Sequence, residues 1–165
     1  MKLTNPEAEC LVFTFKEGLL SKIAHDLRIR ATELSVDIEE GSLKAEIDAS
    51  SLRVETPLKD GVPFDGLSDK NKEEIQGNIR NDVLHADKHP KIHFESTELT
   101  DSRVAGNLTL HGVTRPVEGN ITVEDGRRIV EIELHQPDYG IKPYTAMLGT
   151  LRVQANLKVR FSVPA

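Results

Sequence analysis

Most of the chain alternates between hydrophobic and polar residues with a period of two. The longest run lies near the C-terminus, where every second residue from Leu151 to Val163 is apolar and the residues between them are polar. Side chains of a strand alternate between its two faces, so this pattern predicts a β-strand with one buried and one wet face. Shorter runs of the same kind predict further strands around residues 11–15, 27–31, 34–38, 43–49, 92–94, 104–110, 117–123 and 130–134.

Turn-forming residues separate several of these runs. Connections of this kind lie between alternating segments at residues 40–42, 101–102, 111–112 and 125–127, and three of the four contain glycine. Short loops of this composition are typical of hairpins, which join antiparallel neighbours. The chain is therefore predicted to be an all-β domain of antiparallel strands.

One segment departs from the alternation. From residue 68 to about residue 84 the alternation stops, and the apolar residues recur at the spacing of an amphipathic helix, in a stripe that begins with Leu67 and continues with Ile75, Ile79 and Val83. Ser68 or Asp69 can cap the start of this helix, and Pro90 prevents its continuation into the next strand. Residues 55–66 contain two prolines and two glycines, which predicts a long loop before the helix.

Eight or nine strands with one wet face each can close into a barrel or stack as a sandwich, and alternation does not distinguish the two. A barrel removes exposed sheet edges. With about eight strands its interior can hold side chains or one small ligand. No linker divides the sequence, so residues 1–165 are predicted to form a single domain.

The charge balance excludes one class of partner. The chain carries 21 Lys and Arg against 27 Asp and Glu, for a formal net charge of -6. Nucleic-acid binding needs a concentrated basic face, whereas these basic residues are scattered among acidic ones, so no nucleic-acid partner is expected. No segment reaches the length of a membrane span. The N-terminus lacks a signal-peptide pattern, which favours a cytoplasmic location, or a periplasmic one if this is a mature form.

Three histidines have the spacing of metal ligands. His85, His89 and His93 recur at intervals of four, and histidines four residues apart share one face of a helix. Pro90 interrupts the helix between the last two, so we interpret them as exposed side chains at a helix-to-strand joint and predict no metal site. The same interpretation covers two histidines at strand ends, His111 and His135.

The sequence contains no arrangement typical of a catalytic site. His25 is followed by Asp26, but adjacent residues of a strand point to opposite faces, which argues against a direct acid–base pair. The single Cys10 lies beside an alternating run, where a buried structural thiol is commoner than a catalytic one. It cannot form an intrachain disulfide. No phosphate-binding glycine motif occurs, and no cofactor is predicted.

Both tyrosines of the chain lie in one short connection. Tyr139 and Tyr144 fall within residues 138–149, which also contain glycine, proline and Met147. Two amphipathic rings here could form the rim of a hydrophobic pocket. The same segment could equally turn the chain into its last strand while its apolar side chains cover the core.

Two stretches carry a resemblance to a known family. They are residues 89–96, with the sequence HPKIHFES, and residues 104–117, with the sequence VAGNLTLHGVTRPV. The chain resembles the YceI-like proteins, also called the lipocalin-like polyisoprenoid-binding family. The similarity extends to Asp138-Tyr139-Gly140-Ile141 with the closing strand that follows, and to residues 18–30. The resemblance implies an extended eight-stranded antiparallel β-barrel with one inserted α-helix and a long apolar lumen that accepts a polyprenyl chain.

The leading hypothesis is a binding protein that holds an isoprenoid lipid, such as a polyprenyl phosphate or a quinone tail, without transforming it. Burial of each methylene is worth roughly 0.8 kcal/mol, so a long tail needs few polar contacts. His25, Arg28 or Tyr144 would supply head-group donors at the mouth. The resemblance places the candidate ligand-binding residues in its matching segments: His25, Phe94, Tyr139, Ile141 and Tyr144.

Two alternatives remain open at this stage. One is an interaction scaffold with a filled interior, in which outward apolar residues such as Val12 or Val113 mark an oligomer contact, for instance in a homodimer. The other is an enzyme acting on a small apolar substrate, with His25 or Tyr139 as acid or base.

Overall fold

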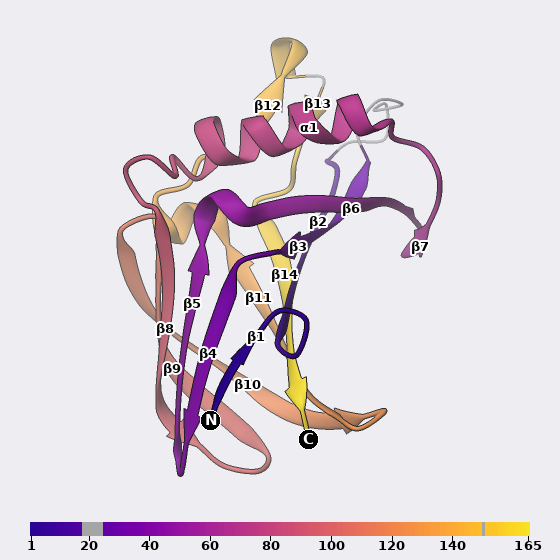
Figure 1. Ribbon diagram of the computed structural model, residues 1–165. Coiled ribbons are helices and arrows are strands. Elements are labelled where there is room, and N and C mark those ends of the chain that lie inside the picture. Colours follow the sequence, from indigo (N-terminus) through magenta and orange to yellow (C-terminus); the bar gives the residue numbers. More distant parts are fainter. Residues whose placement is uncertain (18–24, 150) are drawn as a thin grey trace.

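The computed structural model describes residues 1–17, 25–149 and 151–165. Within these residues, twelve strands form one strongly curled antiparallel sheet, two more form a short ribbon, and one α-helix lies across an end of the sheet (Figure 1). The sheet contains β1 (Lys2–Thr4), β2 (Glu9–Thr14), β3 (Asp26–Ala31), β4 (Leu34–Glu39), β5 (Ser42–Asp48), β6 (Leu52–Lys59), β7 (Val62–Pro63), β8 (Lys91–Leu99), β9 (Arg103–Leu110), β10 (Val113–Glu124), β11 (Arg127–His135) and β14 (Asn156–Pro164).

The remaining elements are shorter. The ribbon pairs β12 (Thr145–Ala146) with β13 (Leu151–Arg152). The helix is α1 (Asp69–Asn78), and it continues into a π-helical turn, η2 (Ile79–Val83). Three 3-10 turns complete the described elements: η1 (Ala49–Ser51), η3 (Gln136–Tyr139) and η4 (Met147–Gly149).

The strand order of the sheet is β1-β4-β5-β8-β9-β10-β11-β14-β2-β3-β6-β7. Every pair is antiparallel, and the four connections predicted as hairpin turns join β4 to β5, β8 to β9, β9 to β10 and β10 to β11. The prediction of an all-β antiparallel fold with one α-helix is confirmed. The expected eight-stranded barrel is not confirmed in detail. The main sheet has twelve strands in the described residues, and some alternating runs are interrupted.

Two of the alternating runs are divided in the structure. The C-terminal run was expected to form one strand, but residues 153–155 separate β13 from β14. The turn η1 likewise separates β5 from β6, where the Asp48 side chain accepts a hydrogen bond from the Ser50 backbone N–H at 2.9 Å. Such a side-chain bond competes with the ladder and bends the strand.

The helix begins where the sequence predicts. The Ser68 side chain accepts a hydrogen bond from the Asn71 backbone N–H at 3.1 Å and caps α1. The loop predicted for residues 55–66 is wrong, because β6 continues to Lys59 and pairs with β7. The turn between them places Asp60 and Gly61 at positive φ, 52° and 79°. Glycine takes this conformation without steric cost.

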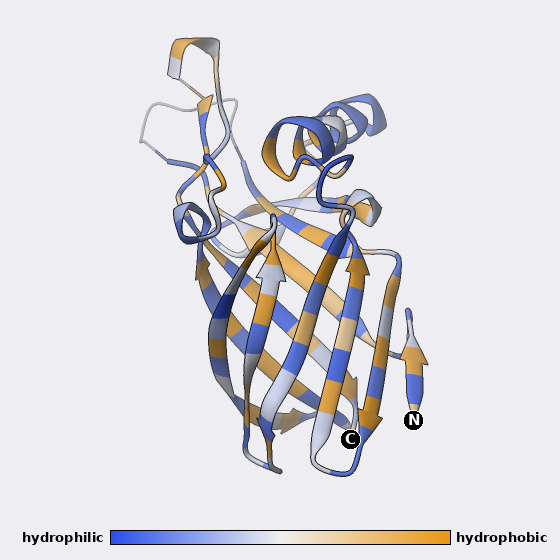
Figure 2. Ribbon diagram, turned by 90° about the vertical axis from the view of Figure 1, so that its left-hand side faces the viewer, coloured by the Kyte–Doolittle hydropathy of each residue, from blue (hydrophilic) through white to orange (hydrophobic). Residues whose placement is uncertain are grey.

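The hydrophobic interior follows from the alternation along the strands, which Figure 2 shows as bands of hydrophobic and hydrophilic residues. One cluster of buried residues lies near both termini and includes Leu3, Cys10, Val36 and Val163. A second, around Tyr139, packs under the η2 end of the helix, and a third packs under α1.

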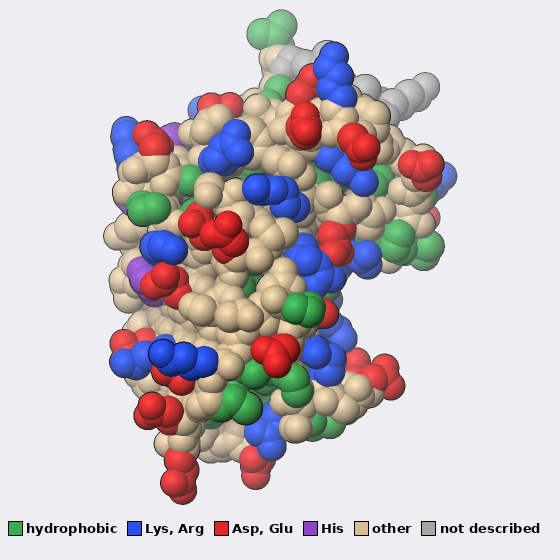
Figure 3. Space-filling view, in the orientation of Figure 1, with side chains coloured by type: hydrophobic (Ala, Val, Ile, Leu, Met, Phe, Trp, Pro, Cys, Tyr) green, Lys and Arg blue, Asp and Glu red, His purple; other side chains and the backbone are tan. Residues whose placement is uncertain are grey.

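On the face drawn in Figure 3, Lys and Arg side chains are interspersed with Asp and Glu, and neither sign forms a continuous patch. In the part of the chain that the structure describes, no helix has both the length and the apolar character needed to cross a membrane.

Candidate functional site

A cavity of about 490 Å³ lies between the inner face of the curled sheet and the helix. Its wall is built mainly from the inward positions of the strands, which are apolar at every second residue. Representative lining residues are Leu27 and Ile29 of β3, Leu108 and Leu110 of β9, Leu134 of β11, and Leu157 of β14. An apolar cavity of this size is suited to binding a hydrophobic ligand.

The helix closes one side of this cavity. Ile75, Ile79 and Val83, the apolar stripe predicted from the sequence, all line it. Leu67 and Ile75 also pack against the cluster formed by Leu27, Ile29 and Val54. The stripe therefore has two roles, since it attaches the helix to the sheet and supplies the cavity with apolar surface.

Polar side chains are few in the cavity wall. Among the described lining residues, only Glu74 and Arg152 carry full charges, and the other polar side chains are Thr14, His25, Asn71, Asn78, Gln136 and Tyr144. Arg152 Nε already donates to the Gly149 carbonyl oxygen at 2.8 Å. Gln136 is buried, and its Nε2 donates to the Gln154 carbonyl oxygen at 3.0 Å.

The lining offers little for covalent chemistry. Cys10 lines the cavity, but burial raises the pKa of its thiol to about 12. A thiol with this pKa stays protonated at neutral pH, so it is a poor nucleophile. Within residues 1–17, 25–149 and 151–165, no group of three His, Cys, Asp or Glu side chains is arranged to hold a metal ion.

Three of the six residues selected from the sequence as ligand contacts lie at the cavity. His25, Ile141 and Tyr144 line it. His25 also contacts the Phe64 ring edge-on, with 5.4 Å between ring centroids. Part of the segment that resembles the family around His25, residues 18–24, lies outside the described residues.

The other three selected residues lie elsewhere. Arg28 alternates with the inward Leu27 and Ile29, so its side chain is on the opposite face, where its Nε donates to Glu55 Oε2 at 2.7 Å. Phe94 packs against the cluster near the termini, away from the cavity lining. Tyr139 is 3% exposed within the second core cluster, and it too is absent from the lining.

The structure also corrects which face of β2 points inward. The sequence suggested that Leu11 and Phe13 were buried and Val12 outward, but Val12 lines the cavity. Phe13 lies on the outer face, where Lys158 Nζ is 5.8 Å from its ring centroid. The aliphatic stem and charge of a lysine cover an outward aromatic ring well. Val113, also expected outward, packs against the second core cluster.

Some lining residues were missed by the sequence analysis. Asn71 and Asn78 of α1 face the cavity together with Ile75. Their spacing of four and three residues places them on one helix face, so the helical period was the available signal. Arg152 was missed because its run was read as a continuous strand with an outward arginine.

The structure brings together a different set of histidines from the one that the spacing suggested. His85 Nδ1 lies 3.0 Å from His111 Nε2, and the ring centroids of His89 and His111 are 4.7 Å apart. His93 is separate, on β8, with its Nδ1 3.4 Å from Glu46 Oε2. His111 belongs to a hairpin turn far from His85 in sequence, so local spacing could not reveal the pair.

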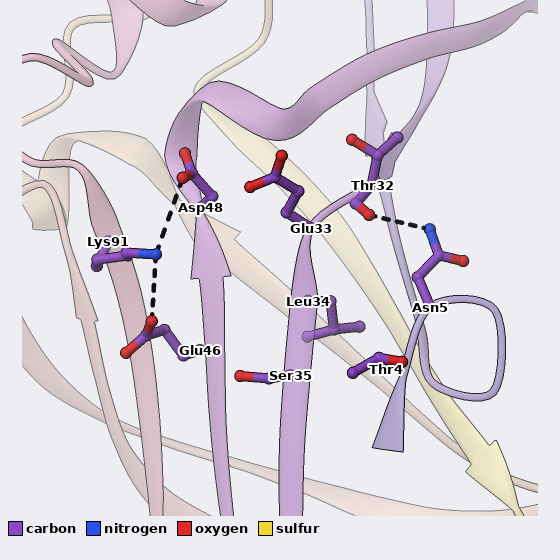
Figure 4. A pocket seen from close by; sticks show the side chains of 9 residues that line it. All are labelled: Thr4, Asn5, Thr32, Glu33, Leu34, Ser35, Glu46, Asp48 and Lys91. Atoms are coloured by element: carbon purple, nitrogen blue, oxygen red, sulfur yellow. Dashed lines mark hydrogen bonds and ion pairs between the residues drawn. The ribbon is translucent and has the colours of Figure 1, made fainter. Parts of the chain in front are cut away.

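A second hollow lies between β1, β4, β5 and β8 and is polar (Figure 4). Its volume is about 320 Å³. Lys91 Nζ lies between Glu46 Oε1, at 3.2 Å, and Asp48 Oδ2, at 3.8 Å. Lys91 thus already pairs with two carboxylates, and the hollow is open to solvent, so it is a weaker candidate for a binding site than the apolar cavity.

Comparison with known proteins identifies related domains. The family model described as YceI-like domain matches residues 4–165. The crystal structure of BcnA from Burkholderia cenocepacia has 12% sequence identity and a TM-score of 0.67, and the alignment covers 96% of each chain. A polyisoprenoid binding domain from Saccharophagus degradans, implicated in plant cell wall breakdown, has 15% identity and a TM-score of 0.63, with 98% of this chain and 95% of that one covered.

The YCEI protein of Campylobacter jejuni has 14% identity and a TM-score of 0.53, with 90% of this chain and 92% of that one covered. At these identities, the likeness to the solved structures concerns the fold alone. No curated protein matches the sequence.

Proposed function

Because the chain belongs to the YceI-like family and encloses an apolar cavity, we propose that it is a binding protein that holds an isoprenoid-type lipid in that cavity without transforming it. The cavity itself carries this proposal, because its wall is apolar from β2, β3, β9, β11, β14 and the helix. Each methylene buried there contributes roughly 0.8 kcal/mol before ordering costs. The similar fold of the S. degradans polyisoprenoid binding domain supports the same ligand class.

A further part of the proposal concerns the sheet. Three pairs of consecutive strands, β1 with β2, β3 with β4, and β5 with β6, act as single bent strands. The pairings of β1 with β4 and of β2 with β3 support this description, as do those of β4 with β5 and of β3 with β6. With β8, β9, β10, β11 and β14, these strands make an eight-stranded barrel, and the pairing of β14 with β2 joins its two ends.

The charges of the lining favour an uncharged head group. A polyprenyl phosphate needs several cations or convergent N–H donors, whereas the described lining has Arg152 as its single full cation and Glu74 as an opposing anion. His25, Asn71 and Tyr144 add side chains that can form hydrogen bonds with a polar head group. A quinone-like or prenol-like head group therefore fits this wall better than a phosphate.

The two alternatives receive less support. An interaction scaffold with a filled interior does not fit a cavity of about 490 Å³. For an enzyme, Tyr139 does not fit as acid or base, because burial raises its pKa and it does not line the cavity. His25 does line the cavity, but the described residues place no reactive thiol and no metal-binding group of side chains with it. The binding function remains the one that the geometry supports best.

The test is native mass spectrometry of the protein purified without added lipid, followed by organic extraction of any bound molecule. We expect a stoichiometric isoprenoid species with an uncharged head group. Leu108→Trp fills the cavity and should abolish this mass increment, whereas Asn107→Trp, one residue away on the outer face of β9, should retain it. An empty wild-type protein that also fails to bind added quinone or prenol lipids would overturn the proposal.

A further inference from the structure

The helical cover, residues 69–84, is attached to the rest of the molecule by more than apolar packing. Within the described residues, three side-chain hydrogen bonds reach the cover or the residue that ends it: Val54 N–H to Gln76 Oε1 at 2.9 Å, Asn78 Nδ2 to the Tyr144 hydroxyl at 3.1 Å, and His85 to His111 at 3.0 Å. Both partners of the third bond are imidazoles. That bond is therefore the one of the three that can respond to pH near neutrality.

The protonation pattern of the histidine pair follows from its third partner. His111 Nδ1 lies 3.1 Å from the Tyr139 backbone carbonyl oxygen. A carbonyl oxygen can only accept, so His111 Nδ1 carries the hydrogen and donates it. In neutral His111 the other nitrogen, Nε2, is then an acceptor, and His85 Nδ1 must donate to it. The three groups form a directed chain from the cover to η3.

The contact is located at the joint where the cover meets the sheet. Leu84 lines the cavity, and His85 follows it directly. The segment before His85 is a π-helical turn in which the Leu84 N–H donates to the Ile79 carbonyl oxygen at 2.8 Å. His85 has a φ of 47°. Unusual backbone geometry of this kind persists only where the surrounding structure stabilises it. The hydrogen bond to His111 is one of the interactions that stabilise the backbone conformation of His85.

The surroundings of the His85–His111 pair make protonation of both imidazoles at once unfavourable. Burial lowers the pKa of His111, and positive charge on His89 and His85 lowers it further, against the opposing effect of the Tyr139 carbonyl. The His89 ring lies against His111, with 4.7 Å between centroids. The other charged groups in the adjoining segments are Arg80 and Asp82 of η2, Asp87 and Lys88 beside His89, Asp138 beside Tyr139, and Arg115 of β10, which together carry no net charge.

We propose that the His85–His111 pair is a pH-sensitive contact that keeps the helical cover closed over the cavity at neutral pH and releases it on acidification, when both imidazoles are protonated. One added proton is tolerated. If the proton binds His85 Nε2, His85 Nδ1–H still donates to His111 Nε2. If it binds His111 Nε2 instead, that nitrogen becomes the donor, and His85 accepts at Nδ1 while its own hydrogen is on Nε2. Two added protons place two N–H groups and two like charges 3.0 Å apart, which breaks the bond.

This contact would regulate exchange of the lipid, and that part of the inference rests on the proposed function. Opening of the cover does not rest on it. Two separate readouts are therefore needed, one for movement of the cover and one for occupancy of the cavity. Hydrogen exchange over residues 69–90, corrected for the intrinsic pH dependence of exchange, reports the first, and fluorescence of the neutral apolar probe N-phenyl-1-naphthylamine reports the second.

Between pH 7.5 and pH 5, we expect exchange of the wild-type cover to rise about tenfold, the effect of losing one hydrogen bond and gaining a like-charge contact. The probe should be released over the same range. His85→Asn is the informative variant, because the Asn amide can replace the Nδ1 donor, tolerates positive φ and does not titrate. It should keep the cover protected at both pH values. His93→Gln, which removes an imidazole on β8 away from the pair, should respond like the wild type.

Each outcome decides the question. Wild-type exchange that stays constant while the protein remains folded would overturn the proposal, and so would an acid response of His85→Asn equal to that of the wild type. A cover that opens as expected in a protein that never binds the probe would uphold the pH-sensitive contact and count against the proposed cavity function instead.

Discussion

Asn78, at the end of α1, donates a hydrogen bond to the hydroxyl of Tyr144, 66 residues further along the chain, at 3.1 Å. Both residues line the cavity. The bond joins the helix to the segment between η3 and the β12–β13 ribbon, so two elements that border the cavity hold each other in place. Tyr144 is therefore a structural tie as well as a candidate ligand contact.

Removal of this tie should loosen the cavity without unfolding the protein. Tyr144→Phe keeps the ring and deletes the hydroxyl, and a hydrogen bond of this kind is worth about 1 kcal/mol. We expect the dissociation rate of a bound apolar probe to rise about fivefold, which is the same free energy expressed as a rate. Asn78→Ala should have a similar effect, and the double variant should add little to either single change. Strict additivity of the two effects would contradict the assigned bond.

A second prediction concerns the outer face of β3 and β6, where Arg28 and Arg30 both donate to Glu55. Burial alone would raise the pKa of Glu55, but hydrogen bonds and positive charge from Arg30 and Arg28 outweigh it and hold this pKa below its usual value. A carboxylate with a depressed folded-state pKa stabilises the fold above its unfolded pKa, about 4.3, and this contribution is lost as the pH falls through the folded-state value.

Glu55→Gln should therefore lower the free energy of unfolding by about 1–2 kcal/mol at pH 7. Urea denaturation at a series of pH values should show the gap between variant and wild type narrowing from about pH 5 downward, as the wild-type carboxylate takes up its proton. A gap that stays constant to pH 3 would mean that the arginines do not interact with the charge of Glu55. Glu95→Gln, on an exposed pair with Lys44, is the control and should change stability little.

The lone cysteine supplies a third prediction. Cys10 is 4% exposed and its pKa is raised to about 12 by burial, so alkylation by iodoacetamide at pH 8 should be slow in the native protein and fast in urea. Mass spectrometry of the alkylated protein measures both rates. Cys10→Ser should also destabilise the fold by about 1–3 kcal/mol, because it buries a hydroxyl with no assigned partner. Rapid alkylation of the native protein would show that the β2 wall opens.

The sequence predicted those features that depend on neighbouring residues. The four hairpin turns follow from local composition, and the apolar stripe of α1 follows from helical spacing, since both signals lie within a few residues. The inward face of β2 could not be predicted in this way, because Phe13 and Val12 are both apolar. Its orientation follows from the pairing of β2 with β14 and β3, where Lys158, from a distant part of the chain, lies over the outward ring of Phe13.

The features of the cavity likewise divide into those that a local sequence pattern predicts and those that depend on distant residues. Residues that line it by strand alternation, such as Leu27 and Ile29, were expected to face inward. The pairing of His85 with His111 depends on the packing of a helix end against a hairpin turn. Contacts of this kind have no period in the sequence, so they become visible only when the two elements are placed in space.

The last prediction compares two glycines, one with no room for a side chain and one with space around it. A Cβ at Gly106 of β9 would lie 2.6 Å from Phe94 Cζ and 2.7 Å from the Ser96 Cα, and it would also meet the Glu95 backbone oxygen. Two of these three atoms belong to the neighbouring backbone and cannot rotate away. Gly77 lies within α1, and a Cβ there has nothing closer than the Arg80 Nη2, at 3.9 Å.

Gly106→Ala should therefore lower the free energy of unfolding by about 2 kcal/mol or more, through overpacking and displacement of β8. Gly77→Ala should raise it by about 0.5–1 kcal/mol, because alanine loses less backbone entropy than glycine in a helix. Urea unfolding of both variants under one set of conditions makes the comparison. Two changes of the same sign would show that β8 yields to the added methyl group at Gly106, or that the helix around Gly77 does not form as described.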